Sequence, residues 1–157
     1  MIYFIEMEVT VTSEYDMKRL GAKLGAALKG GECIELIGDV GAGKTTLTKG
    51  IAEGLGITET VQSPTFTISR TYDAPNGVRL NHYDFYRLSD PGIMSEELAE
   101  SLGELDTSIV IEWGDIVASI LPADHLTVRI VSPTESSRVI SLVASGPAST
   151  ELLGAVS

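Results

Sequence analysis

The chain has 157 residues and a mass of 16.7 kDa, a size at which one domain, spanning residues 1–157, is the default expectation. Its formal net charge is −11, from 22 acidic and 11 basic residues, and every lysine lies between Lys18 and Lys49. A domain that binds nucleic acid by itself shows a basic stripe, so strong direct binding of nucleic acid is not expected. No signal peptide is visible and no apolar run approaches the roughly 18 residues that span a bilayer, which predicts a cytoplasmic protein without a membrane segment.

The beginning of the chain predicts a strand, a helix and a second strand. Residues 2–11 are rich in apolar and β-branched residues, which are typical of a strand. Ser13 offers an N-cap for a helix whose apolar residues recur at helical spacing until two glycines at residues 30–31. The apolar run 33–37 predicts a short buried strand, in which the only cysteine, Cys33, is expected to be a buried structural thiol.

The middle of the chain predicts a hairpin, a helix and another buried strand. Residues 65–72 and 78–84 alternate between apolar and polar residues on either side of a turn signal, which indicates an antiparallel pair. The acidic segment 90–105 has weak helical periodicity. Residues 108–112 contain the apolar run 109–111 and end in a carboxylate, as expected for a second buried strand.

The last part of the chain predicts a short helix at residues 115–121 and a closing hairpin formed by residues 126–131 and 138–144. The tail from about residue 145 is small and polar, and is expected to be loose. Together these elements predict a three-layer α/β sandwich with a mostly parallel central sheet and antiparallel hairpin additions.

Residues 38–45 match the pattern G-x-x-x-x-G-K-[ST] through Gly38, Gly43, Lys44 and Thr45. The pattern follows a buried strand and opens an amphipathic helix, a context that disfavours the alternative of a glycine-rich turn with a surface lysine. The glycines let backbone N–H groups surround phosphates, and the helix N-terminus adds the positive end of its dipole. Lys44 is expected to reach the β- and γ-phosphates, and the Thr45 hydroxyl to hold Mg²⁺.

A GTPase would need an Asn-Lys-x-Asp segment that reads the base, but no lysine follows Lys49, so ATP is favoured. A P-loop also needs a second carboxylate directed at the metal, normally at the end of a buried strand. Asp84 and Glu112 both qualify. For either one, the pattern alone leaves open an ordinary strand-end carboxylate in water.

Four motifs follow one another along the chain in the order of a known family. They are residues 38–46, Ser63-Pro64-Thr65-Phe66-Thr67, His82-x-Asp84-x-Tyr86-Arg87-Leu88 and Glu112-Trp113. In this order they resemble the bacterial ATPases of tRNA threonylcarbamoyladenosine modification, the TsaE family. The resemblance extends over nearly the whole chain and ends near residue 144.

The resemblance implies a Mg²⁺-dependent protein that binds ATP and ADP and hydrolyses ATP slowly when alone. It would act with TsaD- and TsaB-type proteins, which place a threonylcarbamoyl group on the adenosine next to the anticodon of tRNA. The expected catalytic residues are Lys44, Asp84 and Glu112, and Thr45 and Glu112 are expected to hold Mg²⁺. The residues expected to contact the nucleotide are Glu14, Asp39, Val40, Gly41, Ala42, Gly43, Lys44, Thr45, Thr46, Asp84 and Trp113. The expected nucleotide-sensitive switch comprises Ser63, Pro64, Thr65, Phe66 and Thr67.

Two other functions stay open. A small P-loop kinase would usually carry an arginine-rich lid, whereas the arginines here are scattered. A non-catalytic nucleotide-sensing module would use the same residues as a slow ATPase. At single positions, His82 is favoured as a strand histidine over a general base, Trp113 is also compatible with a core position, and Arg87 suits an arginine finger in cis or a salt bridge equally.

Overall fold

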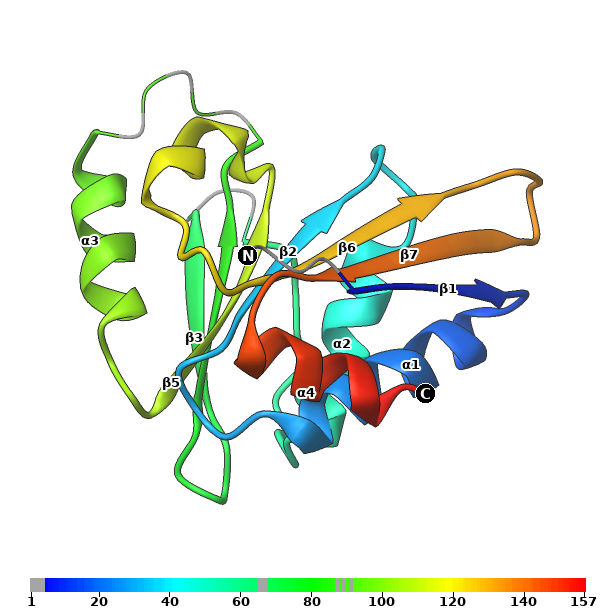
Figure 1. Ribbon diagram of the computed structural model, residues 1–157, viewed down its shortest axis with the longest axis horizontal. Helices are drawn as coiled ribbons and strands as arrows, with labels where there is room; N and C mark the ends of the chain where they lie inside the picture. Colours follow the sequence, from blue (N-terminus) through cyan, green and yellow to red (C-terminus); the bar gives the residue numbers. More distant parts are fainter. Residues whose placement is uncertain (1–4, 65–67, 87, 89, 91) are drawn as a thin grey trace.

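The computed structural model describes residues 5–64, 68–86, 88, 90 and 92–157. Over these residues the chain forms one seven-stranded sheet with helices on both faces (Figure 1). The strands are β1 (Ile5–Val11), β2 (Cys33–Ile37), β3 (Ser69–Asp73), β4 (Arg79–Asp84), β5 (Thr107–Glu112), β6 (Leu126–Val131) and β7 (Arg138–Ala144). The helices are α1 (Glu14–Ala27), α2 (Lys44–Gly54), α3 (Gly92–Leu102), α4 (Pro147–Ala155) and the 3-10 helix η1 (Gly114–Ile120).

The sheet has the order β1-β7-β6-β2-β5-β4-β3. Its centre is parallel, because β2 pairs with both β5 and β6, and β5 also pairs with β4. Its flanks are antiparallel, since β7 joins β1 to β6 on one side and β3 closes the other side against β4. The predicted parallel centre and both predicted hairpins are therefore confirmed.

Alternating residues of the central strands bury two separate apolar cores, and these define the three layers. On β5, Val110 packs in the core formed with α1, α2 and α4, whereas Ile109 and Ile111 pack in the core formed with α3 and η1. Figure 1 shows α3 on the opposite side of the sheet from these three helices. Because both faces of β5 are covered, all its residues are buried, and its centre is the apolar run Ile109–Ile111 that the sequence pattern indicated. Cys33 is buried as predicted, and burial raises its pKa to about 12.

The expectation of a loose tail is wrong. Residues Pro147–Ala155 form α4, which buries Leu152 and Leu153 against the sheet. The N-terminus of α4 is held by Asp124, whose carboxylate accepts hydrogen bonds from the backbone N–H groups of Ala148 (2.8 Å) and Ser149 (3.0 Å). This cap comes from the loop before β6, so no pattern within the tail itself indicated it.

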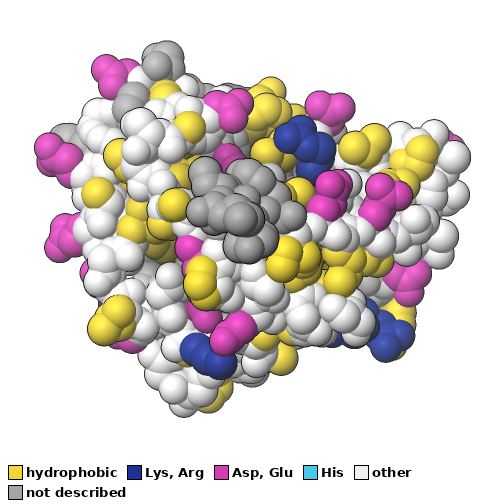
Figure 2. All heavy atoms as spheres, in the orientation of Figure 1, with side chains coloured by type: hydrophobic (Ala, Val, Ile, Leu, Met, Phe, Trp, Pro, Cys, Tyr) yellow, Lys and Arg dark blue, Asp and Glu magenta, His cyan; other side chains and the backbone are white. Residues whose placement is uncertain are grey.

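The surface agrees with the acidic composition. Acidic side chains are spread over the face shown in Figure 2, whereas Lys and Arg side chains stand in isolated places. In the described part of the chain, no helix combines the length and the apolar character needed to cross a membrane.

Candidate nucleotide-binding site

The site lies where three strands of the parallel centre end side by side. Leu36 on β2 pairs with Glu112 on β5, and Glu112 pairs in turn with Asp84 on β4. The loop that follows β2 is the glycine-rich segment, and α2 begins directly after it. The carboxyl ends of parallel strands are where open α/β sheets bind ligands, so the topology brings the predicted phosphate loop and both candidate carboxylates together.

The phosphate loop needs glycine at two positions because its backbone enters the left-handed region. Gly41 has a φ of 83° and Gly43 a φ of 115°. Gly43 is the N-cap of α2, and none of the described side chains caps that helix. The first N–H groups of α2 therefore point into a loop that is free to receive an anion.

Lys44 is the first residue of α2 and is buried. Its Nζ donates a hydrogen bond of 2.6 Å to the Gly38 carbonyl oxygen, and it lies 4.1 Å from the centre of the Trp113 ring. Burial lowers the pKa of Lys44, and this outweighs the opposing effect of Glu112, Asp84 and Asp39. The ammonium is thus partly desolvated beside carboxylates, an environment that favours the approach of a phosphate.

A cavity of about 410 Å³ opens beside Lys44, and most of the predicted site residues line it. Its lining residues are Val40, Gly41, Gly43, Lys44, Thr45, Thr46, Ser63, Asp84, Tyr86, Glu112 and Trp113. The predicted metal ligands Thr45 and Glu112 both belong to this lining. Trp113 lines it as well and is also partly buried against the core of α3 and η1, with a backbone φ of 58° and its ring centre 4.8 Å from that of Tyr86.

Asp84 is buried, and its carboxylate accepts hydrogen bonds from two of the described residues. Ser63 Oγ donates to Asp84 Oδ2 (3.2 Å), and the backbone N–H of Tyr86 donates to Oδ1 (3.0 Å). The first residue of the predicted switch is therefore tied to a site carboxylate. Thr65, Phe66 and Thr67 of the same segment, and Arg87, lie outside the described residues.

Glu112 is also buried, with 3% of its surface exposed, so the alternative of a carboxylate in water does not hold. His82 Nε2 lies 2.5 Å from Glu112 Oε2. His82 is fully buried and does not line the cavity. These facts exclude it as a group that meets a ligand directly.

The oxygen atoms that line the cavity suit Mg²⁺. They do not suit a metal ion that is coordinated by protein side chains alone. In the described residues, no group of three or more His, Cys, Asp or Glu side chains is arranged to hold a metal ion. The cavity instead offers the Thr45 hydroxyl and the carboxylates of Glu112 and Asp84 next to Lys44. Mg²⁺ is commonly bound by one or two protein oxygens, water and substrate phosphates, so these residues fit the ion.

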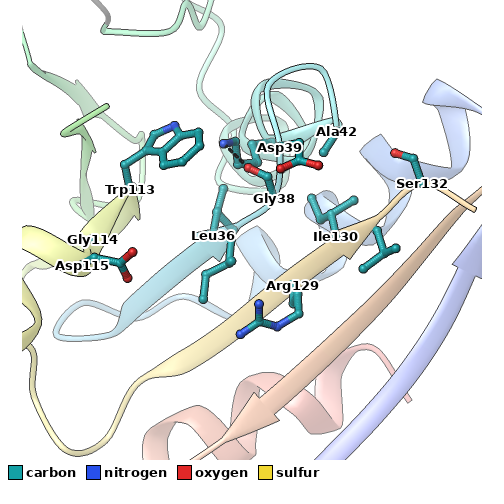
Figure 3. Close-up of a pocket in the computed structure, with 13 residues that line it drawn as sticks. Leu36, Gly38, Asp39, Ala42, Trp113, Gly114, Asp115, Arg129, Ile130 and Ser132 are labelled. Carbon is teal, nitrogen blue, oxygen red and sulfur yellow. Dashed lines mark hydrogen bonds between the residues drawn. The ribbon is translucent and has the colours of Figure 1, made fainter. Parts of the chain in front are cut away.

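Two further cavities adjoin the phosphate loop. One, of about 300 Å³, includes Glu14, Ala42 and Thr46, and Glu14 is exposed there at the start of α1. The other, of about 350 Å³, lies over the carboxyl-terminal ends of β2 and β6 and includes Asp39 and Arg129 (Figure 3). The predicted nucleotide contacts are thus distributed around the loop, and Asp39 and Glu14 lie apart from the cavity that holds Asp84.

Arg138 is a residue of this region that the sequence did not indicate. Its Nε donates to the Ala42 carbonyl oxygen (3.0 Å), while its Nη1 donates to carbonyl oxygens of the preceding turn, at Thr134, Glu135 and Ser137. It joins the β6–β7 turn to the phosphate loop. No local signal marks it, because the two segments are 96 residues apart.

Over most of its length the chain is similar to known proteins of one family. The family described as "Threonylcarbamoyl adenosine biosynthesis protein TsaE" matches residues 11–140. A protein named tRNA threonylcarbamoyladenosine biosynthesis protein TsaE from Streptomyces coelicolor is 43% identical over 115 residues, covering 73% of this chain and 78% of the relative. The protein of that name from Bacillus subtilis is 43% identical over 128 residues, covering 80% and 78%. The crystal structure of YdiB from Bacillus subtilis superposes with a TM-score of 0.80 at 30% identity, over 99% of this chain and 95% of that one.

Proposed function

Because the chain belongs to the TsaE family of threonylcarbamoyl adenosine biosynthesis proteins, we propose that it is a Mg²⁺-dependent ATPase of tRNA threonylcarbamoyladenosine formation. It binds ATP and ADP, hydrolyses ATP slowly by itself, and works with TsaD- and TsaB-type transfer proteins in the cytoplasm. One observation carries the ATPase part of the proposal: Lys44, Thr45, Asp84 and Glu112 line a single cavity at the N-terminus of α2.

Binding of the triphosphate rests on the phosphate loop. The N–H groups at the start of α2 and the Lys44 ammonium supply positive charge from fixed positions, so little reorganisation is needed when the phosphates arrive. When the phosphates bind, Lys44 Nζ either leaves the Gly38 carbonyl for phosphate oxygens or donates to both. Thr45 and Glu112 would hold Mg²⁺, which would neutralise part of the negative charge of the phosphates.

Asp84 orients the attacking water or the triphosphate. The hydrogen bonds from Ser63 and Tyr86 fix the plane of its carboxylate, so its remaining lone pairs point in set directions. Ser63 moves with Asp84 whenever the bound phosphates change, which makes the predicted switch segment sensitive to the nucleotide.

Slow hydrolysis by the isolated chain follows from the charges that the cavity lacks. Among the described residues that line it, Lys44 is the only cation. Phosphoryl transfer is accelerated strongly when a further cation, such as an arginine finger, stabilises the transition state. The partner supplies that cation and so completes the site.

The surface around the cavity is suited to a protein partner. Val40 at the tip of the phosphate loop is 72% exposed and Tyr86 is 48% exposed, and both line the cavity. Apolar and aromatic side chains of this kind are enriched at protein interfaces. The net charge of −11 disfavours direct contact with tRNA, so the link to tRNA runs through the transfer proteins.

The deciding experiment is steady-state ATP hydrolysis by the purified protein, alone and with TsaD- and TsaB-type proteins. We expect slow turnover alone and strong stimulation by the partners. Lys44→Ala should abolish tight ATP binding, whereas Glu112→Ala should mainly weaken Mg²⁺-dependent turnover. Unchanged turnover in both variants would overturn the assignment of the site.

A nucleotide-sensing module is the second candidate, and the hydrogen bond from Ser63 to Asp84 favours it because it couples a loop to the site. A pure sensor would bind its partners equally well with ATP and with a non-hydrolysable analogue, and would support tRNA modification fully with the analogue. Failure of the analogue to support repeated modification would exclude this candidate.

A further inference from the structure

His82 and Glu112 form a buried pair behind the cavity. His82 lies on β4 two residues before Asp84, so both side chains project from the same face of the sheet. Glu112 ends the neighbouring parallel strand β5, where it pairs in register with Asp84, and His82 pairs with Val110. The Glu112 side chain meets His82 Nε2 at 2.5 Å, with both side chains almost fully enclosed.

The chemistry of this contact assigns the donor. A buried carboxylate requires hydrogen bonds to offset the loss of water, and an ionised carboxylate only accepts them. With Glu112 as the accepting carboxylate, the donor of this hydrogen bond is the Nε2–H group of His82. His82 Nδ1 is buried and has no hydrogen-bond partner among the described residues. The ring thus makes one strong polar contact, and that contact is with Glu112.

The two oxygens of Glu112 consequently have different environments. Oε2 is occupied by His82 on the inner side, while no hydrogen bond to Oε1 is found in the described part of the chain. Glu112 itself lines the cavity and His82 does not. A carboxylate with one oxygen anchored from behind presents its other oxygen in a fixed direction, which is how outer-shell partners support metal ligands.

We propose that His82 is a positioning residue: its Nε2–H bond to Glu112 Oε2 holds the Glu112 carboxylate so that Oε1 faces the cavity as a ligand for Mg²⁺. The inference rests on the proposed function, since it assigns a role toward the metal of that site. In this role His82 is neither an inert strand histidine nor a general base.

The test compares three substitutions that differ in whether they can donate to Glu112. Gln places an amide N–H group close to where His carries Nε2–H, so His82→Gln should keep the bond. Asn is one methylene shorter and cannot reach, and Met fills similar volume without a donor. His82→Asn and His82→Gln form the matched pair, since both are neutral amides in the same position.

The readout is the affinity for a non-hydrolysable ATP analogue, measured by titration calorimetry with Mg²⁺ and with a chelator. We expect His82→Asn and His82→Met to lower the gain in affinity from Mg²⁺ by about tenfold, with affinity in chelator unchanged. His82→Gln should stay within about threefold of the unmodified protein. In a Glu112→Ala background, His82→Asn should have no further effect, because its action passes through Glu112.

Several outcomes would overturn the inference. One is an unchanged Mg²⁺ effect in His82→Asn, and another is an equal loss in His82→Gln and His82→Asn. A loss that appears in chelator would assign His82 to the packing of the fold. If His82→Met does not fold, the Asn and Gln pair decides by itself. If the unmodified protein binds no analogue, the proposed function fails together with the inference, whereas Mg²⁺-dependent binding that is insensitive to His82 overturns the inference alone.

Discussion

Gly25 on α1 packs directly against the backbone of Ile51 on α2. A Cβ atom at Gly25 would lie 2.0 Å from the Ile51 carbonyl oxygen, and one at Gly21 would lie 2.3 Å from the Leu47 carbonyl oxygen. The contact is reciprocal, since Gly50 on α2 meets the backbone of α1 at Lys18 equally closely. This contact fixes the spacing between α1 and α2, the helix into which the phosphate loop leads.

The first prediction concerns this contact. Gly25→Ala should lower the free energy of unfolding by about 1–3 kcal/mol, because backbone atoms cannot move aside as a flexible side chain can. Gly154→Ala on α4 is the control, since a Cβ there meets nothing within 4 Å. It should be neutral or stabilising by up to about 1 kcal/mol. Urea denaturation measures both, and equal stability of the two variants would contradict the packing described here.

The second prediction concerns Asp124 and the start of α4. Burial alone would raise the pKa of Asp124, but hydrogen bonds from the Ser149 hydroxyl and from the N–H groups of Ser149 and Ala148 outweigh it and lower the pKa below the usual 3.8. Since the folded pKa lies below the unfolded one, this stabilisation is present above pH 3.8 and is lost as pH falls through the folded value.

Asp124→Ala should therefore cost about 0.5–2 kcal/mol of stability at neutral pH, as the loss of a helix cap does. The cost should shrink as pH falls below 4. Asp124→Asn is the control, because it keeps a hydrogen-bond acceptor but cannot titrate. Its free energy of unfolding should therefore depend less on pH below 4, and at pH 7 it should lose less stability than Asp124→Ala. Thermal unfolding followed across pH 2–7 checks this, and an Ala variant with a pH-independent deficit would refute it.

The third prediction concerns His125 and Glu35. His125 Nε2 lies 3.7 Å from Glu35 Oε1, and this contact with the carboxylate raises the pKa of His125 above 6.5, against the effect of burial. A raised pKa means that the stabilisation is complete below pH 6.5 and is lost as pH rises through the folded value. The free energy of unfolding should thus fall by on the order of 1 kcal/mol as pH rises from 6.5 through the folded pKa.

Glu35→Gln removes the charge and nearly preserves the shape of the side chain. We expect the variant to lose this fall in stability as pH rises above 6.5. Melting temperatures of both proteins at matched ionic strength give the comparison. If the two profiles run parallel, the pair makes no pH-dependent contribution.

The fourth prediction concerns Arg138 and the phosphate loop. Arg138→Lys keeps the charge but removes the planar fork that bonds Ala42 and the β6–β7 turn at once. We expect nucleotide affinity to fall by about 3–10-fold, corresponding to the loss of one ordinary hydrogen bond. Arg70→Lys, at an exposed position on β3, is the matched control and should leave affinity unchanged. Equal affinities for both variants would show that the bond to Ala42 does not support the loop.

The amino-acid sequence by itself determined the local features of this protein. The strands at residues 33–37, 126–131 and 138–144 have the predicted limits, and Ser13 caps α1 as expected. These features depend on apolar periodicity, glycine conformation and side-chain capping within a few residues. The order of the four motifs also predicted the family, which the comparisons confirm.

Only the tertiary structure decided how distant segments combine. It placed Asp84 beside Glu112 at neighbouring strand ends, buried Glu112 against His82, and joined Arg138 to Ala42. It also made α4 from a tail with little helical pattern, by bringing the Asp124 carboxylate to its first turn. Such contacts depend on the order of strands in the sheet, and that order is set by the burial of apolar faces over the whole chain rather than by any local pattern.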